Sequence, residues 1–534
     1  MAGTRRAVAS RGKSWQRRGA PLAAGVVAAA LAVLPSGANA ASVGGGTGGG
    51  APLSAVPAGA YAPATDMGSM YTISRIVRAT NAWQAGYTGK GIDIALIDSG
   101  VSPVQGLTSG NVVNGPDLSF DSQRPGLTNL DGYGHGTHMA GLIVGRDQAS
   151  STPAGYASTP ASQFTGIAPD ARLVSVKVGA FDGSVDVSQV IAGITWVTQH
   201  AHDPGFNIRV ISLSYGTDSM QPYQVDPLAY AVEAAWRAGI VVVVSGGNDG
   251  TPATVLANPG YDPYVLAVGA DDPQGTTDIG NDTVPDFTSR GTNDRHVDLV
   301  APGAHVAGLV VPGSIVATAH PGAIVGTRYL RGSGTSQSTA IVAGAAALVL
   351  QKYPNATPDQ VKRQLMASSR PFTSTTNIYR GNGVVDVYGS LSNPLNSGVQ
   401  NLAASTGTGS LDQARGTQYV NDGVADLRGE KDIMGAAWSA GTYSSLVAQG
   451  KSWNGGTWNS KSWAGSTWTG KSWAGSTWAN ATWTGADWTG KSWADSSWTG
   501  KSWASGSWSS GTWAGKSWAG KSWAGAVWAD AVWN

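Results

Sequence analysis

Short apolar runs alternate with segments of helical periodicity through the middle of the chain. The runs are rich in Val, Ile and Leu at consecutive positions, which is typical of parallel strands that helices cover on both faces. They span residues 92–98, 173–178, 210–214, 240–245 and 265–268. Segments with apolar residues at helical spacing lie between these runs, at residues 188–201, 227–238 and 339–353. The pattern predicts an α/β domain over residues 71–392, with three layers and a parallel sheet in the middle.

The first 70 residues follow a different pattern. A basic start is followed by an apolar run over residues 20–34 and then by a stretch of small residues that ends at Ala40. This order predicts a cleaved signal peptide over residues 1–40, and therefore a secreted protein, because the run is too short for a membrane anchor. No later run is long enough to span a membrane, and paired arginines near the start leave Sec and twin-arginine export as alternatives. Residues 41–70 are rich in Gly, Ala and Pro, and we expect them to form a disordered linker.

Trp recurs every five residues near the end of the chain, from Trp453 to Trp533. We expect residues 393–434 to be a linker or transition region and residues 435–534 to form this repeat. A period of five gives a single Trp face neither on a strand nor on a helix, whereas a coil that turns every five residues does. The repeat is therefore expected to be a β-solenoid, with a disordered low-complexity tail as the alternative. Exposed indole rings would stack on sugars, so a cell-wall or polysaccharide surface is one partner we consider, and a stability or solubility tail is the plainer interpretation.

Composition narrows the chemistry and the partners. Charged residues make up 13% of the chain and the formal net charge is +1, so no basic field points to a nucleic acid. The chain contains no cysteine, which excludes disulfides, thiolate metal sites and cysteine nucleophiles. An exported chain without disulfides needs a large packed core for its stability, and we expect this one to be a monomer.

Several polar residues lie where the predicted strands and helices begin or end. Asp98 closes the first strand, and Asn248 lies in a glycine-rich turn after a later strand. His135 stands between two glycines ahead of a helix of small residues, and Ser336 lies at the start of another helix. Taken singly, Asp98, Asn248 and Ser336 also fit plain roles as caps or turn residues. A helix start, however, favours developing negative charge at Ser336, and Asn248 carries a neutral donor suited to an oxyanion.

A zinc site at His135 and His138 is the competing interpretation of the histidine motif. The motif lacks the neighbouring glutamate of a helical zinc-hydrolase sequence, and the chain has no cysteine. We therefore assign no metal-ligating residues.

The order Asp, His, Asn, Ser makes the chain resemble the subtilase family over roughly 320 residues, and this order differs from those of chymotrypsin and the α/β-hydrolases. The motifs that carry the resemblance are Ile97-Asp98-Ser99-Gly100, His135-Gly136-Thr137-His138, Ser212-Leu213-Ser214-Tyr215-Gly216, Gly247-Asn248, Val300-Ala301-Pro302-Gly303 and Gly334-Thr335-Ser336. The resemblance implies a subtilisin-like fold and a serine endopeptidase that acts on proteins or peptides.

The resemblance also implies a role for each residue. Asp98, His135 and Ser336 would form the catalytic triad of an acyl-enzyme mechanism, and Asn248 would complete the oxyanion hole. The residues implied to line the pocket for the residue before the cleaved bond are Ser214, Tyr215, Gly216 and Ala257. None of these is a carboxylate, so an apolar residue is expected at the substrate position that this pocket binds.

The chain departs from the family pattern in three places. After Ser336 the family typically has Met-Ala-x-Pro, whereas this chain continues Gln337-Ser338-Thr339-Ala340. Residues 146–163 form an insertion where many relatives bind calcium, and Asp147 is its only acidic residue, which is too little charge for calcium there. A structural calcium ion elsewhere stays open. Only residues 41–70 are left for the folding pro-domain that relatives commonly carry.

A different class of function is a cell-surface adhesin or attachment protein with a vestigial protease domain. All the positions implied to be catalytic are filled, which argues against a loss of activity.

Overall fold

The structure is a computed structural model that describes residues 61–122, 126–250, 253, 255–420, 426–454, 457–462, 468–469 and 488–489. The predicted signal peptide and most of the predicted linker lie outside the described residues. Most of the Trp repeat does too, and with it the prediction of a β-solenoid or a disordered tail. No helix in the described part is long and apolar enough to cross a membrane.

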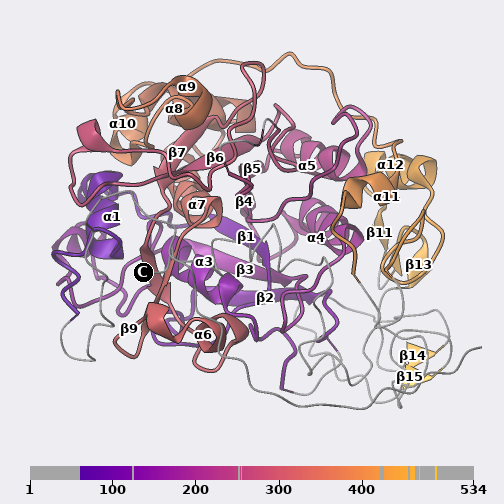
Figure 1. The fold of residues 1–534 in the computed structure, drawn as a ribbon, viewed down its shortest axis with the longest axis horizontal. Coiled ribbons are helices and arrows are strands. Elements are labelled where there is room, and N and C mark those ends of the chain that lie inside the picture. The colour runs from indigo at the N-terminus through magenta and orange to yellow at the C-terminus, as the bar shows by residue number, and fades with distance from the viewer. Residues whose placement is uncertain are drawn as a thin grey trace, which may run out of the picture. The chain divides into compact units, whose positions relative to one another are not determined.

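A seven-stranded sheet forms the centre of the fold (Figure 1), with strands in the order β2-β3-β1-β4-β5-β6-β7. Every neighbouring pair runs parallel. The strands are β1 (Asp93–Asp98), β2 (Val112–Asp117), β3 (Arg172–Lys177), β4 (Ile208–Leu213), β5 (Val241–Ser245), β6 (Leu266–Asp271) and β7 (Leu299–Pro302). The five runs predicted from the sequence correspond to β1, β3, β4, β5 and β6.

The apolar pattern missed the two outermost strands. Strand β2 contains Gly115 and Pro116, and its first three residues are only partly buried or exposed. Strand β7 has four residues and ends at Pro302. Short strands and prolines belong at sheet edges, where one row of hydrogen-bonding groups needs no partner strand, and they give a weak sequence signal there.

Helices flank the sheet, which confirms the predicted three-layer arrangement. Helices α3 (His135–Val144) and α7 (Thr335–Lys352) pack together, and α7 crosses β4, β5, β6 and β7. Helices α4 (Val187–His200) and α5 (Pro227–Arg237) pack together as a second pair, with α4 against β1 and α5 against β5 (Figure 1). The Asp186 side chain and Gln189 form a capping box at the start of α4, and Asp226 caps α5 just before a proline.

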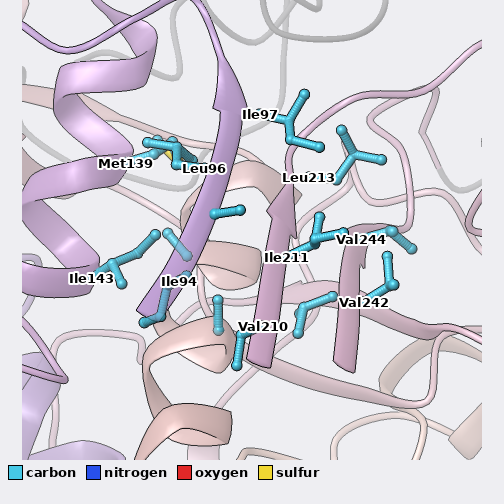
Figure 2. Packing of buried hydrophobic residues seen from close by; sticks show 14 of the residues in the cluster. Ile94, Leu96, Ile97, Met139, Ile143, Val210, Ile211, Leu213, Val242 and Val244 are labelled. Carbon is cyan, nitrogen blue, oxygen red and sulfur yellow. The ribbon is translucent and has the colours of Figure 1, made fainter. Parts of the chain in front are cut away.

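Apolar packing joins helix α3 to the strand in front of it. Leu96 and Ile94 of β1 belong to one buried cluster with Met139 and Ile143 of α3 (Figure 2). Because this contact is dry and close-packed, it fixes the helix that begins at His135 relative to the end of β1.

The remaining helices and strands are short. The helices are α1 (Met70–Ile76), α2 (Ala79–Gln84), η1 (Pro153–Ser158), η2 (Ile279–Asn281), α6 (Ile315–Ala319), η3 (Pro321–Ala323), α8 (Pro358–Ser368), α9 (Asn377–Arg380), α10 (Val387–Ser392), α11 (Leu411–Arg415) and α12 (Ala440–Ala448). The strands are β8 (Val306–Leu309), β9 (Ile324–Val325), β10 (Tyr329–Gly332), β11 (Trp453–Asn454), β12 (Thr457–Trp458), β13 (Lys461–Ser462), β14 (Trp468–Thr469) and β15 (Trp488–Thr489). Strands β8, β10 and β9 form an antiparallel sheet.

Residues 61–70 pack against the domain that the sequence predicts from residue 71. Asp66 forms an ion pair with Arg331 of β10, with 2.7 Å between the charged atoms, and the ring of Tyr61 lies 5.3 Å from that of Tyr329. These residues are less dominated by Gly and Ala than residues 41–60, which gives them side chains to pack.

The chain also stays packed beyond residue 392. Arg415 of α11 is fully buried and pairs with Asp186, the cap of α4, with 2.6 Å between Nε and Oδ1. Further on, Trp453 Nε1 donates to the Ala192 carbonyl of α4 (2.9 Å), and Trp458 is 1% exposed. The first units of the Trp repeat are therefore part of the packed domain, and their indoles are not free to stack on a sugar.

Candidate active site

The predicted site residues lie at or just beyond the ends of strands and in the first turns of two helices. Asp98 is the last residue of β1, Ser214 follows β4, and Asn248 lies three residues after β5. His135 and Ser336 occupy the first turns of α3 and α7, two helices that pack together. The carboxyl ends of parallel strands share one edge, where α/β proteins commonly place reactive side chains.

Asp98 and His135 form a buried hydrogen-bonded pair. His135 Nδ1 lies 2.9 Å from Asp98 Oδ1 and 3.0 Å from Oδ2, and the side chains are 0% and 1% exposed. The Ser99 backbone N–H donates to Asp98 Oδ1 at 2.7 Å. A carboxylate accepts hydrogen bonds only, so the geometry assigns the proton to Nδ1 and leaves Nε2 as the basic nitrogen.

Asp131, which the sequence analysis did not single out, organises the loop in front of His135. Its carboxylate accepts from the backbone N–H groups of Gly134 and Thr137, both at 2.7 Å, and from Ser99 Oγ at 2.9 Å. It is 1% exposed, and burial raises its pKa although the N–H donors act in the opposite direction. The helix cap itself is Gly134, which has no side chain to offer. Asp131 lies outside the cap position and supplies the hydrogen-bond acceptors that an N-cap side chain would otherwise provide.

A glycine is required directly after His135. A Cβ at Gly136 would lie 2.2 Å from the Gly100 carbonyl oxygen and 3.1 Å from Asp98 Oδ1. The Gly136 N–H donates to Ser99 Oγ at 2.9 Å. This close approach brings the first turn of α3 onto the end of β1, which is what places the imidazole against its carboxylate.

Ser336 lies at the second position of α7 and is 1% exposed. Its carbonyl oxygen accepts from Ser214 Oγ at 3.3 Å, whereas its own Oγ makes no hydrogen bond to any described residue. The structure thus joins Asp98 to His135 directly and leaves the hydroxyl of Ser336 unengaged. Catalytic hydrogen bonds are often long without substrate and shorten in the complex.

The Asn248 amide is oriented by the residue before Ser336. Thr335 donates to Asn248 Oδ1 from both its backbone N and its Oγ1, each at 3.0 Å. This fixes which end of the amide is the oxygen and turns Nδ2 toward Gly334, where it lies 3.3 Å from the position a Cβ would take. The arrangement offers an N–H donor beside the loop that carries Ser336.

Gly216 and Ala257, both predicted to line the pocket, lie close together. A Cβ at Gly216 would lie 2.5 Å from the Cβ of Ala257, so only glycine fits there. The neighbouring segments are tied together by the Thr217 N–H, which donates to the Asn258 carbonyl at 3.0 Å. The Tyr215 side chain is 1% exposed, so it belongs to the core, and only its backbone can line a cleft.

No metal centre is evident in the described part of the chain, where no group of three or more His, Asp or Glu is placed to hold an ion. His138 is buried, and burial, together with His135, lowers its pKa to about 3. Asp147, the acidic residue of the 146–163 insertion, pairs with Arg328. The Asp147 carboxylate therefore already forms an ion pair with an arginine of the protein.

Comparison with known proteins places this geometry in context. The pattern of the subtilase family matches residues 89–409. Serine protease AprX of Bacillus subtilis (strain 168) is 38% identical over 284 residues, which cover 52% of this chain and 61% of that protein. Subtilisin DY of Bacillus licheniformis is 31% identical over 314 residues, covering 58% of this chain and 95% of its own length. Subtilisin Savinase of Lederbergia lenta is 33% identical, and the match covers 59% of this chain and 95% of that enzyme.

Proposed function

The chain belongs to the subtilase family of subtilisin-like serine endopeptidases, and we propose that it hydrolyses peptide bonds through an acyl-enzyme intermediate on Ser336. The observation that carries this proposal is the buried Asp98–His135 hydrogen bond at the start of α3, the helix that packs against α7, whose second residue is Ser336. We further propose that the enzyme is exported and acts as a monomer.

His135 acts as the base in the first step. As Ser336 Oγ attacks the scissile carbonyl carbon, the hydroxyl proton moves to His135 Nε2, and Asp98 stabilises the imidazolium that forms. The same proton then passes to the leaving amine as the carbon–nitrogen bond breaks. In the second step His135 activates a water, which attacks the ester and releases Ser336 and the new carboxyl end of the substrate.

The oxyanion of each tetrahedral intermediate is bound by two donors. They are Asn248 Nδ2 and the backbone N–H of Ser336, which lies in the first turn of α7, where the helix dipole favours negative charge. Loss of such a side-chain donor lowers turnover on the order of 10²- to 10³-fold, a magnitude measured in subtilisin.

The specificity pocket is proposed to accept an apolar side chain before the cleaved bond. Its implied wall and base consist of Ser214, the backbone at Tyr215, Gly216 and Ala257. The backbone at Gly216 lies so close to Ala257 that a Cβ there would clash, and none of these four residues is a carboxylate that would bind Lys or Arg.

Attachment to a cell-wall polysaccharide is proposed for the part of the Trp repeat beyond residue 462. This proposal rests on the regular spacing of Trp from Trp463 to Trp533. The buried indoles of Trp453 and Trp458 instead support a structural role for the first units.

Ser336→Ala provides the first test of the peptidase function. The variant should fold with unchanged thermal stability and should lose hydrolysis of a proteome-derived peptide mixture, because the nucleophile is gone. Mass spectrometry of the mixture also reports the residue before each cleaved bond. Near-normal cleavage by Ser336→Ala would contradict the proposal.

A further inference from the structure

Five consecutive polar side chains open helix α7, at residues 335–339. Three of them donate to nearby acceptors: Thr335 Oγ1 to Asn248 Oδ1 (3.0 Å), Ser338 Oγ to the Ala301 carbonyl (2.8 Å) and Thr339 Oγ1 to the Thr335 carbonyl (2.8 Å). The other two are Ser336, the proposed nucleophile, and Gln337. This turn therefore contains one polar side chain, Gln337, that neither the hydrogen bonds of the fold nor the proposed mechanism uses.

Gln337 is fully buried, and its Oε1 and Nε2 make no hydrogen bond to any described residue. A buried carboxamide without partners costs stability, and each such group in a native fold calls for an explanation. If the side chain served only to fill space, an apolar side chain of the same size would do so without that cost. The amide is thus a candidate for a function that needs a polar group.

The Gln337 amide faces the donor of the proposed oxyanion hole. Gly334 has no Cβ, and the position that a Cβ would occupy there serves as a common reference. It lies 3.0 Å from Gln337 Oε1 and 3.3 Å from Asn248 Nδ2. An acceptor on Gln337 and a donor on Asn248 therefore lie around the same point of the backbone, two residues before Ser336. Because Thr335 holds Asn248 Oδ1, the identity of that donor is fixed by the structure.

We propose that Gln337 is a positioning residue that orients Asn248 for oxyanion binding, an inference that rests on the proposed function. Asn248 Nδ2 carries two hydrogens. One donates to the oxyanion, and the other donates to Gln337 Oε1 through one water, since the structure shows no direct bond between the two amides. Held at Oδ1 by Thr335 and at Nδ2 by Gln337, the amide plane keeps its donor aimed at the charge that develops during attack.

A double-mutant cycle between Gln337 and Asn248 tests this inference. The variants Gln337→Met, Asn248→Ala and the double variant are compared with the wild type on one peptide p-nitroanilide that has an apolar residue before the anilide. Met fills a similar volume without the amide. We expect Gln337→Met to lower kcat roughly tenfold with KM nearly unchanged, and to lower kcat less than about twofold in the Asn248→Ala background.

Two controls separate positioning from a general structural effect. The thermal midpoint of Gln337→Met should be equal to or above that of the wild type, because the buried Nε2 group, to which the proposal gives no partner, has been removed. Ser338→Ala removes a polar group of the same turn that bonds Ala301, and it should keep kcat within about twofold of the wild type.

The inference is overturned if Gln337→Met keeps wild-type kcat, or if it lowers kcat by the same factor with and without Asn248. A lowered thermal midpoint with a matching loss in both backgrounds would likewise assign Gln337 to packing. The wild type and Ser336→Ala are measured in the same assay. A wild type no more active than Ser336→Ala would instead contradict the proposed peptidase function and Gln337's role with it.

Discussion

Asp131 shows how a residue outside the triad sets the position of His135. Helix α3 begins at His135, but its cap is a glycine, so the free N–H groups of the first turn need another acceptor. The Asp131 carboxylate accepts from the backbone N–H groups of Gly134 and Thr137 and from the Ser99 hydroxyl. The oxygen of that hydroxyl in turn accepts from the Gly136 N–H. Asp98 therefore holds the imidazole directly, and Asp131 fixes the backbone turn that carries it.

Asp131→Ala should both destabilise the fold and slow hydrolysis. Three buried donors lose their acceptor, which we expect to lower the free energy of unfolding by about 3 kcal/mol. The freed turn no longer fixes His135, so kcat/KM should fall on the order of tenfold. Urea unfolding and hydrolysis of a peptide anilide measure the two effects. Asp131→Asn, which keeps one acceptor, should fall between the wild type and Asp131→Ala, and an Ala variant equal to the wild type would contradict this role.

At this scale the sequence singles out those residues that a motif surrounds. Asp98, His135, Asn248 and Ser336 stand in glycine-rich motifs at predicted strand and helix ends, and the structure brings Asp98 and His135 into hydrogen-bonding contact. Asp131 was missed because it lies outside the cap position of α3 and because one of its donors, Ser99, is 32 positions away in the sequence. Its position four residues before the start of α3, close to the cap position, was the available signal.

At the scale of elements, the loop after β6 carries a buried pair of carboxylates. Asp271 ends β6 and is 0% exposed, Asp282 follows η2 and is 1% exposed, and the two carboxylates interact with each other. Burial raises the pKa of both, that of Asp282 to about 6, while Arg370 acts in the opposite direction. A loop that connects two parallel strands thus brings a titrating group into the core.

The sign of the resulting pH dependence follows from the raised values. Between about pH 4, where an unfolded Asp titrates, and about pH 6, the folded state holds more protons than the unfolded state. The free energy of unfolding contributed by this pair therefore falls as pH rises through that window, and the pair destabilises the fold at neutral pH.

Asp282→Asn should restore part of the free energy of unfolding that is lost as pH rises. An amide stays neutral and can donate to Asp271, so the variant should be more stable than the wild type by roughly 1–3 kcal/mol at pH 7.5. The advantage should shrink toward pH 4.5. Urea unfolding at the two pH values measures it, and parallel changes for variant and wild type would argue against the carboxylate pair as the cause.

The strands that are buried on both faces were easier to predict from the sequence than the strands at the sheet edges. The strands β1, β4 and β5 lie inside the sheet, and their apolar runs predict them. The edge strands β2 and β7 have no comparable apolar run. The same limit explains why α11 was assigned to a linker. Its key contact is Arg415 with Asp186, more than two hundred positions away, and a single Arg carries no sequence signal of burial.

At the scale of the whole molecule, residues 440–454 and 457–458 pack on helices α4 and α5 of the domain. After α12 packs on α5, Trp453 and Trp458 pair across strands β11 and β12 and insert against α4. Trp458 Nε1 also donates to Thr195 Oγ1 at 3.2 Å. Repeat periodicity alone gave no reason to separate these first units from the later ones. The burial of these first units comes from the helix surface that they contact.

Two truncations test this division of the repeat. A chain that ends at residue 450 exposes the α4 surface and loses two indoles that each bury about 150–250 Å², so its free energy of unfolding should drop by about 3–6 kcal/mol. A chain that ends at residue 462 keeps both indoles and should stay within about 1 kcal/mol of the full chain. Thermal and urea unfolding compare the three. Equal stability of the two truncated chains would contradict the packed role of Trp453 and Trp458.

Labelling with a fluorophosphonate tests the central claim most directly, because the reagent reacts with a serine only when a base and an oxyanion hole activate it. The account predicts one adduct per chain, located by peptide mass spectrometry on Ser336, with hydrolysis lost in step. His135→Ala should slow the reaction by on the order of 10³-fold or more. An adduct on another residue, or full labelling of Ser336 in the His135→Ala variant, would contradict the assignment of Asp98, His135 and Ser336 as the catalytic triad.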